Sequence, residues 1–208
     1  MQDNLCVGLD FSKDIDAYVS YISLLEAKLY KINPAFISYL NIRLVARYLN
    51  NRNIKWIYDA KYGDVYHTNI KYAEYVFEEL GASAVTLNPY VGFESLQPFF
   101  DYKDKQCFIL CKTTHEGHST FQSPEKVIEF VRGKSNIGIV YASNDMQGLA
   151  KIAKQLPETK ILSPGIGIQG GVIQSSNKNI IYSVSRSIYQ SEYPKETYQA
   201  YLDKLDLL

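Results

Sequence analysis

Three charged residues at the end of one short apolar run have the types and spacing needed for acid–base chemistry. The run Ile54–Tyr58 is followed by Asp59, Lys61 and Asp64. Side chains alternate between the two faces of a β-strand, so Asp59 and Lys61 are expected on the same face, with Asp64 in the loop beyond. Two carboxylates beside one ammonium suit proton transfer or electrostatic catalysis. A solvated ion pair at a strand end is the alternative that spacing alone leaves open.

A glycine-rich segment and an arginine near the end of the chain form a second candidate site. The segment Ser163–Gly171 is rich in glycine, and Ser185–Ser187 contains Arg186. Glycine lets backbone N–H groups approach an anion closely, and a guanidinium is a planar fork that matches phosphate oxygens. The two segments predict a phosphate site and therefore a phosphorylated small substrate.

The elements that must position these residues alternate along the chain. Short apolar runs predict strands at Leu5–Leu9, Leu29–Asn33, Ile54–Asp59, Ala84–Asn88, Cys107–Lys112, Ile137–Tyr141, Lys160–Ser163 and Ile180–Val184. Amphipathic segments predict helices at Asp14–Lys28, Pro34–Asn50, Asn69–Leu80, Pro124–Gly133, Asp145–Gln155 and Pro194–Leu205. Strands that are apolar throughout and alternate with helices indicate a parallel sheet with covered faces.

Eight such strands in 208 residues predict one (β/α)8 TIM barrel that spans residues 1–208. A doubly wound open sheet is the competing fold, but the count of eight and the lack of an early G-x-G-x-x-G disfavour it. In a barrel the catalytic groups lie at the carboxyl ends of the strands, and phosphate commonly binds after strands seven and eight. Both candidate sites fall at these positions.

Other polar residues also follow the predicted strands. These are Asp10, Lys31, Asn33, Asn88, Thr113, Thr114 and Ser143. For Asn33, Asn88 and Ser143 we favour a local role in binding loop backbone, whereas the joint placement of the whole set indicates an active site at one end of the barrel.

Composition excludes several classes of protein. Lysine plus arginine equals aspartate plus glutamate at 22 each, so no net field favours nucleic acid or an anionic membrane. Three cysteines do not form a disulfide framework, and buried thiols are expected. No apolar run approaches a membrane span and no signal peptide opens the chain, so a soluble cytoplasmic protein is expected.

A metal site is not predicted. The histidines are His67, near the charged cluster, and His115 and His118, whose spacing is not the H-E-x-x-H arrangement of zinc enzymes. Lys61 already supplies positive charge between the two aspartates, which argues against a divalent ion there. We interpret the histidines as loop residues.

The order and content of these motifs resemble the orotidine 5′-phosphate decarboxylase family over nearly the whole chain. The matching segments are Cys6–Asp10, Lys31–Phe36, Asp59–Asp64 with Thr68, Leu87–Tyr90, Lys112–Gly117, Pro164–Gly171 and Ser185–Tyr189. The D-x-K-x-x-D motif alone is shared with sister sugar-phosphate enzymes. Its combination with P-G-x-G-x-Q-G-G and R-S-I-Y is specific.

The resemblance implies a (β/α)8 barrel that converts orotidine 5′-monophosphate to UMP without a cofactor. It implies that Lys61 is the proton donor within an array of Lys31, Asp59, Lys61 and Asp64, and that the enzyme is a homodimer with shared sites. The remaining substrate-binding residues that it implies are Asp10 and Lys31 for the ribose, Thr68 and Asp64 from the partner subunit, Thr114 for the pyrimidine, and Pro164, Gln169, Gly170, Ser185 and Arg186 around the phosphate.

Two other functions remain open at this stage. One is a metal-dependent decarboxylase or aldolase of the same superfamily that acts on a sugar phosphate. The other is a nucleotide-binding barrel without catalytic activity. The complete set Lys31, Asp59, Lys61 and Asp64 disfavours the second, because a protein that only binds has no need of an isolated acid.

Overall fold

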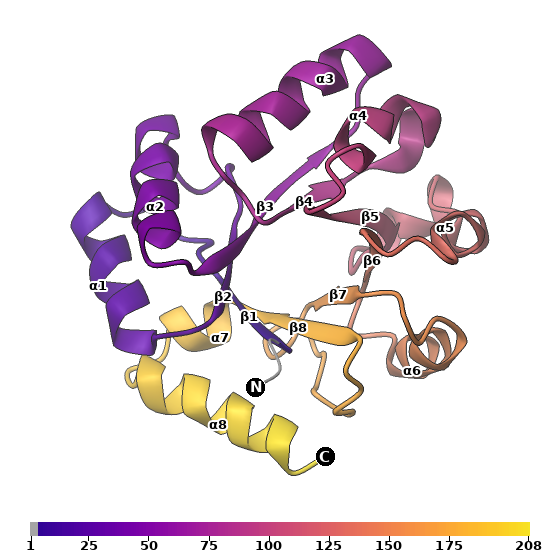
Figure 1. The fold of residues 1–208 in the computed structure, drawn as a ribbon. Helices are drawn as coiled ribbons and strands as arrows, with labels where there is room; N and C mark the ends of the chain where they lie inside the picture. Colours follow the sequence, from indigo (N-terminus) through magenta and orange to yellow (C-terminus); the bar gives the residue numbers. More distant parts are fainter. Residues whose placement is uncertain (1–3) are drawn as a thin grey trace.

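Eight parallel strands close into a barrel in chain order, which confirms the predicted (β/α)8 fold (Figure 1). The computed structural model describes residues 4–208, except the side chains of Glu116 and His118. The strands are β1 (Leu5–Gly8), β2 (Leu29–Ile32), β3 (Lys55–Tyr62), β4 (Ala84–Leu87), β5 (Gln106–Lys112), β6 (Ile137–Tyr141), β7 (Ile161–Pro164) and β8 (Ile180–Val184). Strand β8 pairs with β1, so the sheet has no free edge.

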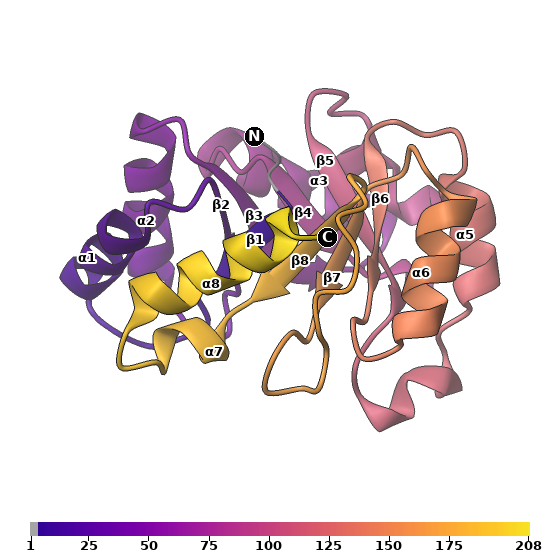
Figure 2. The same ribbon diagram turned by 90° about the horizontal axis from the view of Figure 1, so that it is seen from below.

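Helices surround the barrel, as Figure 1 shows. The α-helices are α1 (Ile15–Leu25), α2 (Tyr39–Asn51), α3 (Tyr66–Glu74), α4 (Gln97–Phe100), α5 (Pro124–Val131), α6 (Met146–Gln155), α7 (Arg186–Tyr189) and α8 (Pro194–Asp206). A π-helical turn, η1 (Tyr75–Glu79), continues α3, and short 3-10 turns lie at η2 (Pro89–Val91), η3 (Glu94–Leu96) and η4 (Glu116–Thr120). In Figure 2, α8 crosses the outside of the barrel beside α7 and α1.

The short helices α4 and α7 were not predicted, and α3 begins at Tyr66 rather than Asn69. Three further differences bear on the site. Strand β3 extends to Tyr62 rather than ending at Asp59, because Tyr62 pairs with Leu87 of β4 after a register shift. Helix α2 begins at Tyr39 rather than Pro34, because Ser38 caps it by accepting a hydrogen bond from the Asn41 N–H. In the described part of the chain no helix connects β7 to β8. The glycine-rich segment fills this connection instead.

The apolar side chains form two packed layers. One layer fills the barrel interior and includes Ile57, Phe108 and Leu162. The larger layer lies between the strands and the helices and includes Trp56, which is fully buried. Because adjacent strand residues face opposite layers, nearly every strand residue is buried, which explains the continuously apolar runs in the sequence.

The three cysteines are buried free thiols, as the sequence predicts. Burial raises the pKa of the Cys6 thiol to about 12, so this thiol is protonated at neutral pH. Among the helices of residues 4–208, none is both long and apolar enough to cross a bilayer.

Candidate active site

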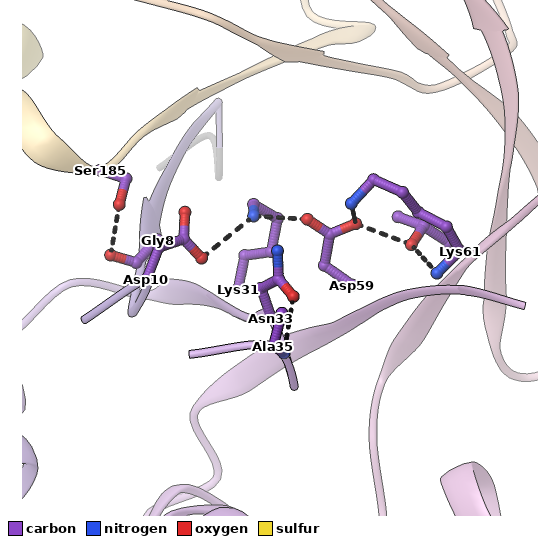
Figure 3. A network of polar contacts seen from close by, with 9 residues as sticks. Gly8, Asp10, Lys31, Asn33, Ala35, Asp59, Lys61 and Ser185 are labelled. Atoms are coloured by element: carbon purple, nitrogen blue, oxygen red, sulfur yellow. Dashed lines mark hydrogen bonds and ion pairs between the residues drawn. The ribbon is translucent and has the colours of Figure 1, made fainter. Parts of the chain in front are cut away.

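Asp59 lies at the centre of a chain of alternating charges (Figure 3). Its Oδ2 atom is 2.6 Å from Lys31 Nζ, and its Oδ1 atom is 2.7 Å from Lys61 Nζ. Lys31 Nζ also lies 3.5 Å from Asp10 Oδ1. These four side chains, from β2, β3 and the end of β1, therefore alternate in sign across the carboxyl end of the barrel.

The array is buried at its centre and open at Lys61. The side chains of Lys31 and Asp59 are 7% and 8% exposed, whereas that of Lys61 is 42% exposed. A buried ion pair holds its geometry because breaking it would leave an unpaired charge in the protein interior. Lys61 is therefore anchored on one side by Asp59 while its ammonium remains accessible to a bound molecule.

The protonation of the buried pair follows from the same contacts. Burial alone favours the neutral acid of Asp59, but Lys31 and then Lys61 outweigh it and hold the pKa of Asp59 well below its usual range. Burial also acts to lower the pKa of Lys31, and there Asp59 and Asp10 outweigh it, so that the pKa is raised. Both groups are charged at neutral pH.

Thr86 of β4 joins the backbone of β3 to the array. Its hydroxyl donates a hydrogen bond to Asp59 Oδ1 at 2.8 Å and accepts one from the Lys61 backbone N–H at 3.0 Å. Lys61 has φ of 53°, a left-handed conformation that is uncommon for a residue with a side chain. The regular alternation assumed from the sequence is therefore interrupted at Lys61, and the Thr86 contact stabilises the conformation that brings its ammonium back to Asp59.

A cavity of about 460 Å³ opens beside the array at the carboxyl end of the barrel. It is lined by Asp10, Lys31, Asn33, Phe36, Asp59, Lys61, Leu110, Thr113, Thr114, Val140, Leu162, Pro164, Gly165, Ile166, Ile168, Gln169, Ser183, Ser185, Arg186, Ser187 and Tyr189. Most of the predicted site residues thus share one cavity. Its size is in the range of about 300–1,000 Å³ that small-molecule sites occupy.

The closed barrel fixes the order of these groups around the cavity. Strands β7 and β8 carry Gln169 and Arg186 in the segments that follow them, and β8 is the neighbour of β1. At that junction the Ser185 hydroxyl donates a hydrogen bond to the Gly8 carbonyl at 3.2 Å. Around the barrel, β1 and β2 thus lie between the segments with Gln169 and Arg186 and the strand with Lys61.

Gly165 explains why the segment after β7 needs glycine. Its φ is +102°, and a Cβ atom there would lie 2.9 Å from Thr114 Cγ2 and 3.1 Å from Ser143 Oγ. Any larger residue would push the β5 and β6 loops away from β7. The Ser143 hydroxyl also donates to the Pro164 carbonyl at 2.8 Å, which confirms its predicted role in binding loop backbone.

A neighbouring cavity of about 830 Å³ extends the site toward the loops after β4 and β5. It shares Lys61, Leu110, Thr113 and Thr114 with the first cavity, and its further lining includes Tyr90 and Phe121. The rings of Tyr90 and Phe121 pack edge to face with centroids 5.6 Å apart. Lys61 therefore stands where the two cavities meet.

Comparison with known proteins agrees with this geometry. A sequence model of the orotidine 5′-phosphate decarboxylase / HUMPS family matches residues 3–201. The chain belongs to this family. An orotidine 5′-phosphate decarboxylase of Roseiflexus castenholzii is 32% identical over 234 aligned residues, which cover 92% of this chain and 85% of that protein.

Two further relatives support the family assignment. An orotidine 5′-phosphate decarboxylase of Dehalococcoides mccartyi is 39% identical over 138 residues, which cover 59% of this chain and 51% of that protein. The solved structure of Leishmania donovani OMP decarboxylase superposes with a TM-score of 0.83 at 29% identity and covers 98% of this chain and 92% of that one. The barrel fold and the family membership thus agree.

Three residues to which the family resemblance assigns a role lie away from the cavity. Asp64, Thr68 and Gly170 do not line it, although Gly170 is next to Gln169, which does. The Asp64 carboxylate instead accepts a hydrogen bond from the Val65 N–H at 2.7 Å. Asp64 and Thr68 were assigned to the site of a partner subunit, so this position within one chain agrees with that prediction without testing it.

His67 and His115 do not gather with other metal-binding side chains. In the described part of the chain, no group of three or more His, Cys, Asp or Glu side chains is arranged to hold a metal ion. His67 is exposed, and its ring packs edge to face on Tyr66. His115 Nδ1 forms a hydrogen bond with the Thr113 hydroxyl at 2.7 Å. The side chain of His118 lies outside the described residues.

Sequence reasoning missed Thr86 and the aromatic residues Phe36 and Tyr189. Phe36 and Tyr189 line the cavity, and Thr86 is buried beneath it. The one available signal for Thr86 was a hydroxyl in the otherwise apolar strand Ala84–Leu87. That signal does not distinguish a catalytic contact from a hydroxyl bonded to its own backbone.

Proposed function

We propose that this protein decarboxylates orotidine 5′-monophosphate to UMP without a metal ion or cofactor, with Lys61 as the proton donor. The observation that carries the proposal is the partly exposed ammonium of Lys61, which lies 2.7 Å from buried Asp59. It borders a cavity that is also lined by the glycine-rich segment after β7. The names of the curated relatives agree with this substrate.

The substrate fits the cavity in one direction. The phosphate lies at the β7 and β8 end, on Gln169, Arg186 and nearby backbone N–H groups. The ribose hydroxyls lie against Asp10 and Lys31, which already share a contact of 3.5 Å. The pyrimidine then reaches Thr114 and C6 faces Lys61.

In the proposed reaction, charged side chains stabilise the carbanion that forms at C6. The bond between C6 and the carboxylate breaks, CO2 leaves, and the electron pair that remains on C6 takes a proton from Lys61 Nζ. No cofactor accepts that pair, so stabilisation comes from a preorganised ammonium near C6. A carboxylate held about 4 Å from the substrate carboxylate opposes its binding by about 4 kcal/mol at an effective dielectric near 20, and loss of CO2 relieves this repulsion.

We further propose a homodimer in which Asp64 and Thr68 complete the partner's site. The support is a set of exposed apolar side chains on the loops and helix starts after β2, β3 and β4: Phe36, Tyr39, Leu40, Val65, Tyr66, Tyr90 and Val91. A large exposed apolar surface beside a site marks an interaction surface. A two-fold axis through it brings the loop with Asp64 to the neighbouring barrel.

A direct assay tests the proposed reaction. Purified protein with excess chelator is mixed with orotidine 5′-monophosphate, and the loss of its absorbance is followed. The expected result is complete conversion to UMP at a rate that the chelator does not change. Decay that stops with chelator would favour the metal-dependent sugar-phosphate enzymes of the same superfamily. UMP binding without any decay would favour a barrel that only binds nucleotides.

A further inference from the structure

One fully buried polar side chain lies near the start of α3, among neighbours that are open to solvent. Asn69 is 0% exposed, whereas Val65, Tyr66 and His67 are exposed and Thr68 is half-buried. Burying an amide is unfavourable unless its polar atoms form hydrogen bonds. The contacts that the Asn69 side chain makes therefore indicate what it does in the structure.

The amide nitrogen of Asn69 joins two loops at the carboxyl end of the barrel. Nδ2 donates to the Asp64 carbonyl at 2.6 Å and to the Ser95 carbonyl at 2.7 Å. Asp64 lies in the loop after β3, and Ser95 lies in η3, which leads into α4 beside α3 (Figure 1). In the described part of the chain Oδ1 has no hydrogen-bond partner, so the side chain acts through these two donated bonds.

The backbone of Asp64 lies between two residues whose surroundings differ. Gly63 packs closely against the end of β4, because a Cβ atom there would lie 2.4 Å from the Asn88 carbonyl oxygen. Val65 begins α3 without a side-chain hydrogen bond to the end of the helix. The bond from Asn69 to the Asp64 carbonyl therefore restricts the loop on the side where the close packing of Gly63 ends.

The second bond fixes Asp64 relative to the loop after β4. The Ser95 hydroxyl donates to the Gly92 carbonyl at 2.7 Å, which holds η3 to the end of η2. Tyr90 of η2 is 71% exposed and belongs to the apolar surface through which the proposed dimer forms. Through Ser95, the Asn69 amide thus connects Asp64 to the loop that carries part of this surface.

We propose that Asn69 is a positioning residue for the active site of the partner subunit. The inference rests on the proposed homodimer, in which Asp64 completes the neighbouring site. Asn69 does not line the cavity and acts through the Asp64 backbone. A small displacement of a group in an active site can cost about a hundredfold in rate, so loss of this bond should impair the site that receives Asp64.

Two variants remove the contacts and one variant is a matched control. Asn69→Ala removes both hydrogen bonds, and Asn69→Ser keeps one donor and is the milder change. Asn179 is also buried, and its Nδ2 donates to the Ala153 and Leu156 carbonyls at 3.2 and 2.8 Å, while its Oδ1 has no described partner. It precedes β8, at the opposite end of the barrel from the site. Asn179→Ala therefore reports the loss of a similar buried amide without the connection to Asp64.

The first measurements compare the three variants as homodimers below their unfolding temperatures. Turnover should fall by roughly ten- to a hundredfold in Asn69→Ala and by less in Asn69→Ser. Asn179→Ala should keep normal turnover even if its unfolding temperature falls as far. Hydrogen–deuterium exchange, which needs no activity, should become faster at residues 64–68 and 92–96 in Asn69→Ala and not in Asn179→Ala. Unchanged exchange in both segments would show that Asn69 does not hold these loops.

Subunit mixing then shows which active site Asn69 serves. In a mixture of Lys61→Ala with Asn69→Ala, each mixed dimer has one site with an intact Lys61 and an Asp64 whose own chain keeps Asn69. About a quarter of normal activity should therefore return. In a mixture of Asp64→Ala with Asn69→Ala, every site of the mixed dimer carries a defect, so activity should not rise above the mean of the two parents. The opposite pattern would mean that Asn69 serves its own chain's site, and would overturn the inference.

A reference mixture separates this inference from the shared site on which it rests. Lys61→Ala with Asp64→Ala contains no change at Asn69. Recovery in this mixture but not in Lys61→Ala with Asn69→Ala would remove the role of Asn69 and leave the shared site standing. If neither mixture recovers after subunit exchange is demonstrated, the shared site itself fails. Asn69→Ser should reproduce both mixing results with smaller changes, which keeps the test available if Asn69→Ala does not fold.

Discussion

The hydroxyl of Thr86 accepts a hydrogen bond from the backbone N–H of Lys61 at 3.0 Å, across the β3–β4 pair. The same hydroxyl donates to the carboxylate that binds the Lys61 ammonium. One buried side chain thus holds both ends of the proposed proton donor, its backbone directly and its ammonium through Asp59. This contact stabilises the left-handed conformation of Lys61.

Thr86→Val tests that relationship. Valine keeps the shape but cannot form either hydrogen bond, so the Lys61 N–H and one lone pair of Asp59 lose their partner at a cost of about 1–3 kcal/mol each. Turnover should fall by roughly ten- to a hundredfold with little change in KM, while Thr86→Ser restores most of it. Thr159→Val, at another buried threonine, is the matched control. Equal effects of the two valine variants on turnover would leave Thr86 a purely structural residue.

Lys61→Ala removes the proposed proton donor. Turnover should fall by about 10³-fold or more, because the donor and the counter-charge of the carbanion are lost together. UMP binding should remain, since the phosphate and ribose contacts are intact. Lys71→Ala, on exposed α3, is the control and should be fully active. Steady-state absorbance assays and UMP titration measure both effects, and a Lys61→Ala enzyme with a tenth of normal turnover would exclude the assigned role.

Arg186→Ala should raise KM strongly and also lower turnover, because phosphate binding is used partly in the transition state. Added guanidinium should restore part of the lost activity by occupying the vacated position. Arg132→Ala, at the end of α5 and outside the cavity, should have normal kinetics. Unchanged kinetics of Arg186→Ala toward the phosphorylated substrate would remove the phosphate assignment from the β8 end.

Mixed dimers test the shared site. Lys61→Ala and Asp64→Ala should each be nearly inactive as homodimers. When equal amounts of the two variants exchange subunits at random, half of the dimers are mixed. Each mixed dimer has one site with both defects and one site with neither. About a quarter of normal activity should therefore return. If mass spectrometry demonstrates subunit exchange but no activity returns, Asp64 serves its own chain.

Asp145, in the loop after β6, is expected to make the stability of the protein depend on pH in the acid range. Its carboxylate caps α6 through the Gly148 N–H, pairs with Lys112 Nζ at 2.7 Å and accepts from the Tyr141 hydroxyl at 2.7 Å. The Lys112 and Tyr141 hydrogen bonds lower the pKa of Asp145 to about 2, from an ordinary value of 3.8.

The direction in which pH changes the stability of the protein follows from the lowered pKa of Asp145. The folded state binds the proton less tightly than the unfolded chain does, so the stabilisation is complete above pH 3.8 and is lost as the pH falls toward about 2. Asp145→Asn keeps the cap and removes the charge. Urea unfolding should show the variant less stable than the unchanged protein at pH 6, with the gap closing by pH 2. A gap independent of pH would contradict the assignment.

The sequence by itself determined the fold and the residue types of the candidate site. Eight apolar runs that alternate with amphipathic segments specify a parallel barrel, since each strand must be covered on both faces. The position of each charged residue relative to these runs then indicates its place in the barrel. Asp59 and Lys61 end the third strand, and Arg186 follows the eighth. These features are local in the chain and can be read from spacing.

The tertiary structure decided everything that depends on pairs distant in sequence. The register of β3 against β4 placed Thr86 beneath Asp59 and gave Lys61 its left-handed backbone, and no local pattern encodes that register shift. Closure of β8 on β1 brought Ser185 to Gly8. The same closure gathered Asp10, Lys61 and Arg186 around one cavity, because side chains far apart in the chain meet only when the barrel is complete.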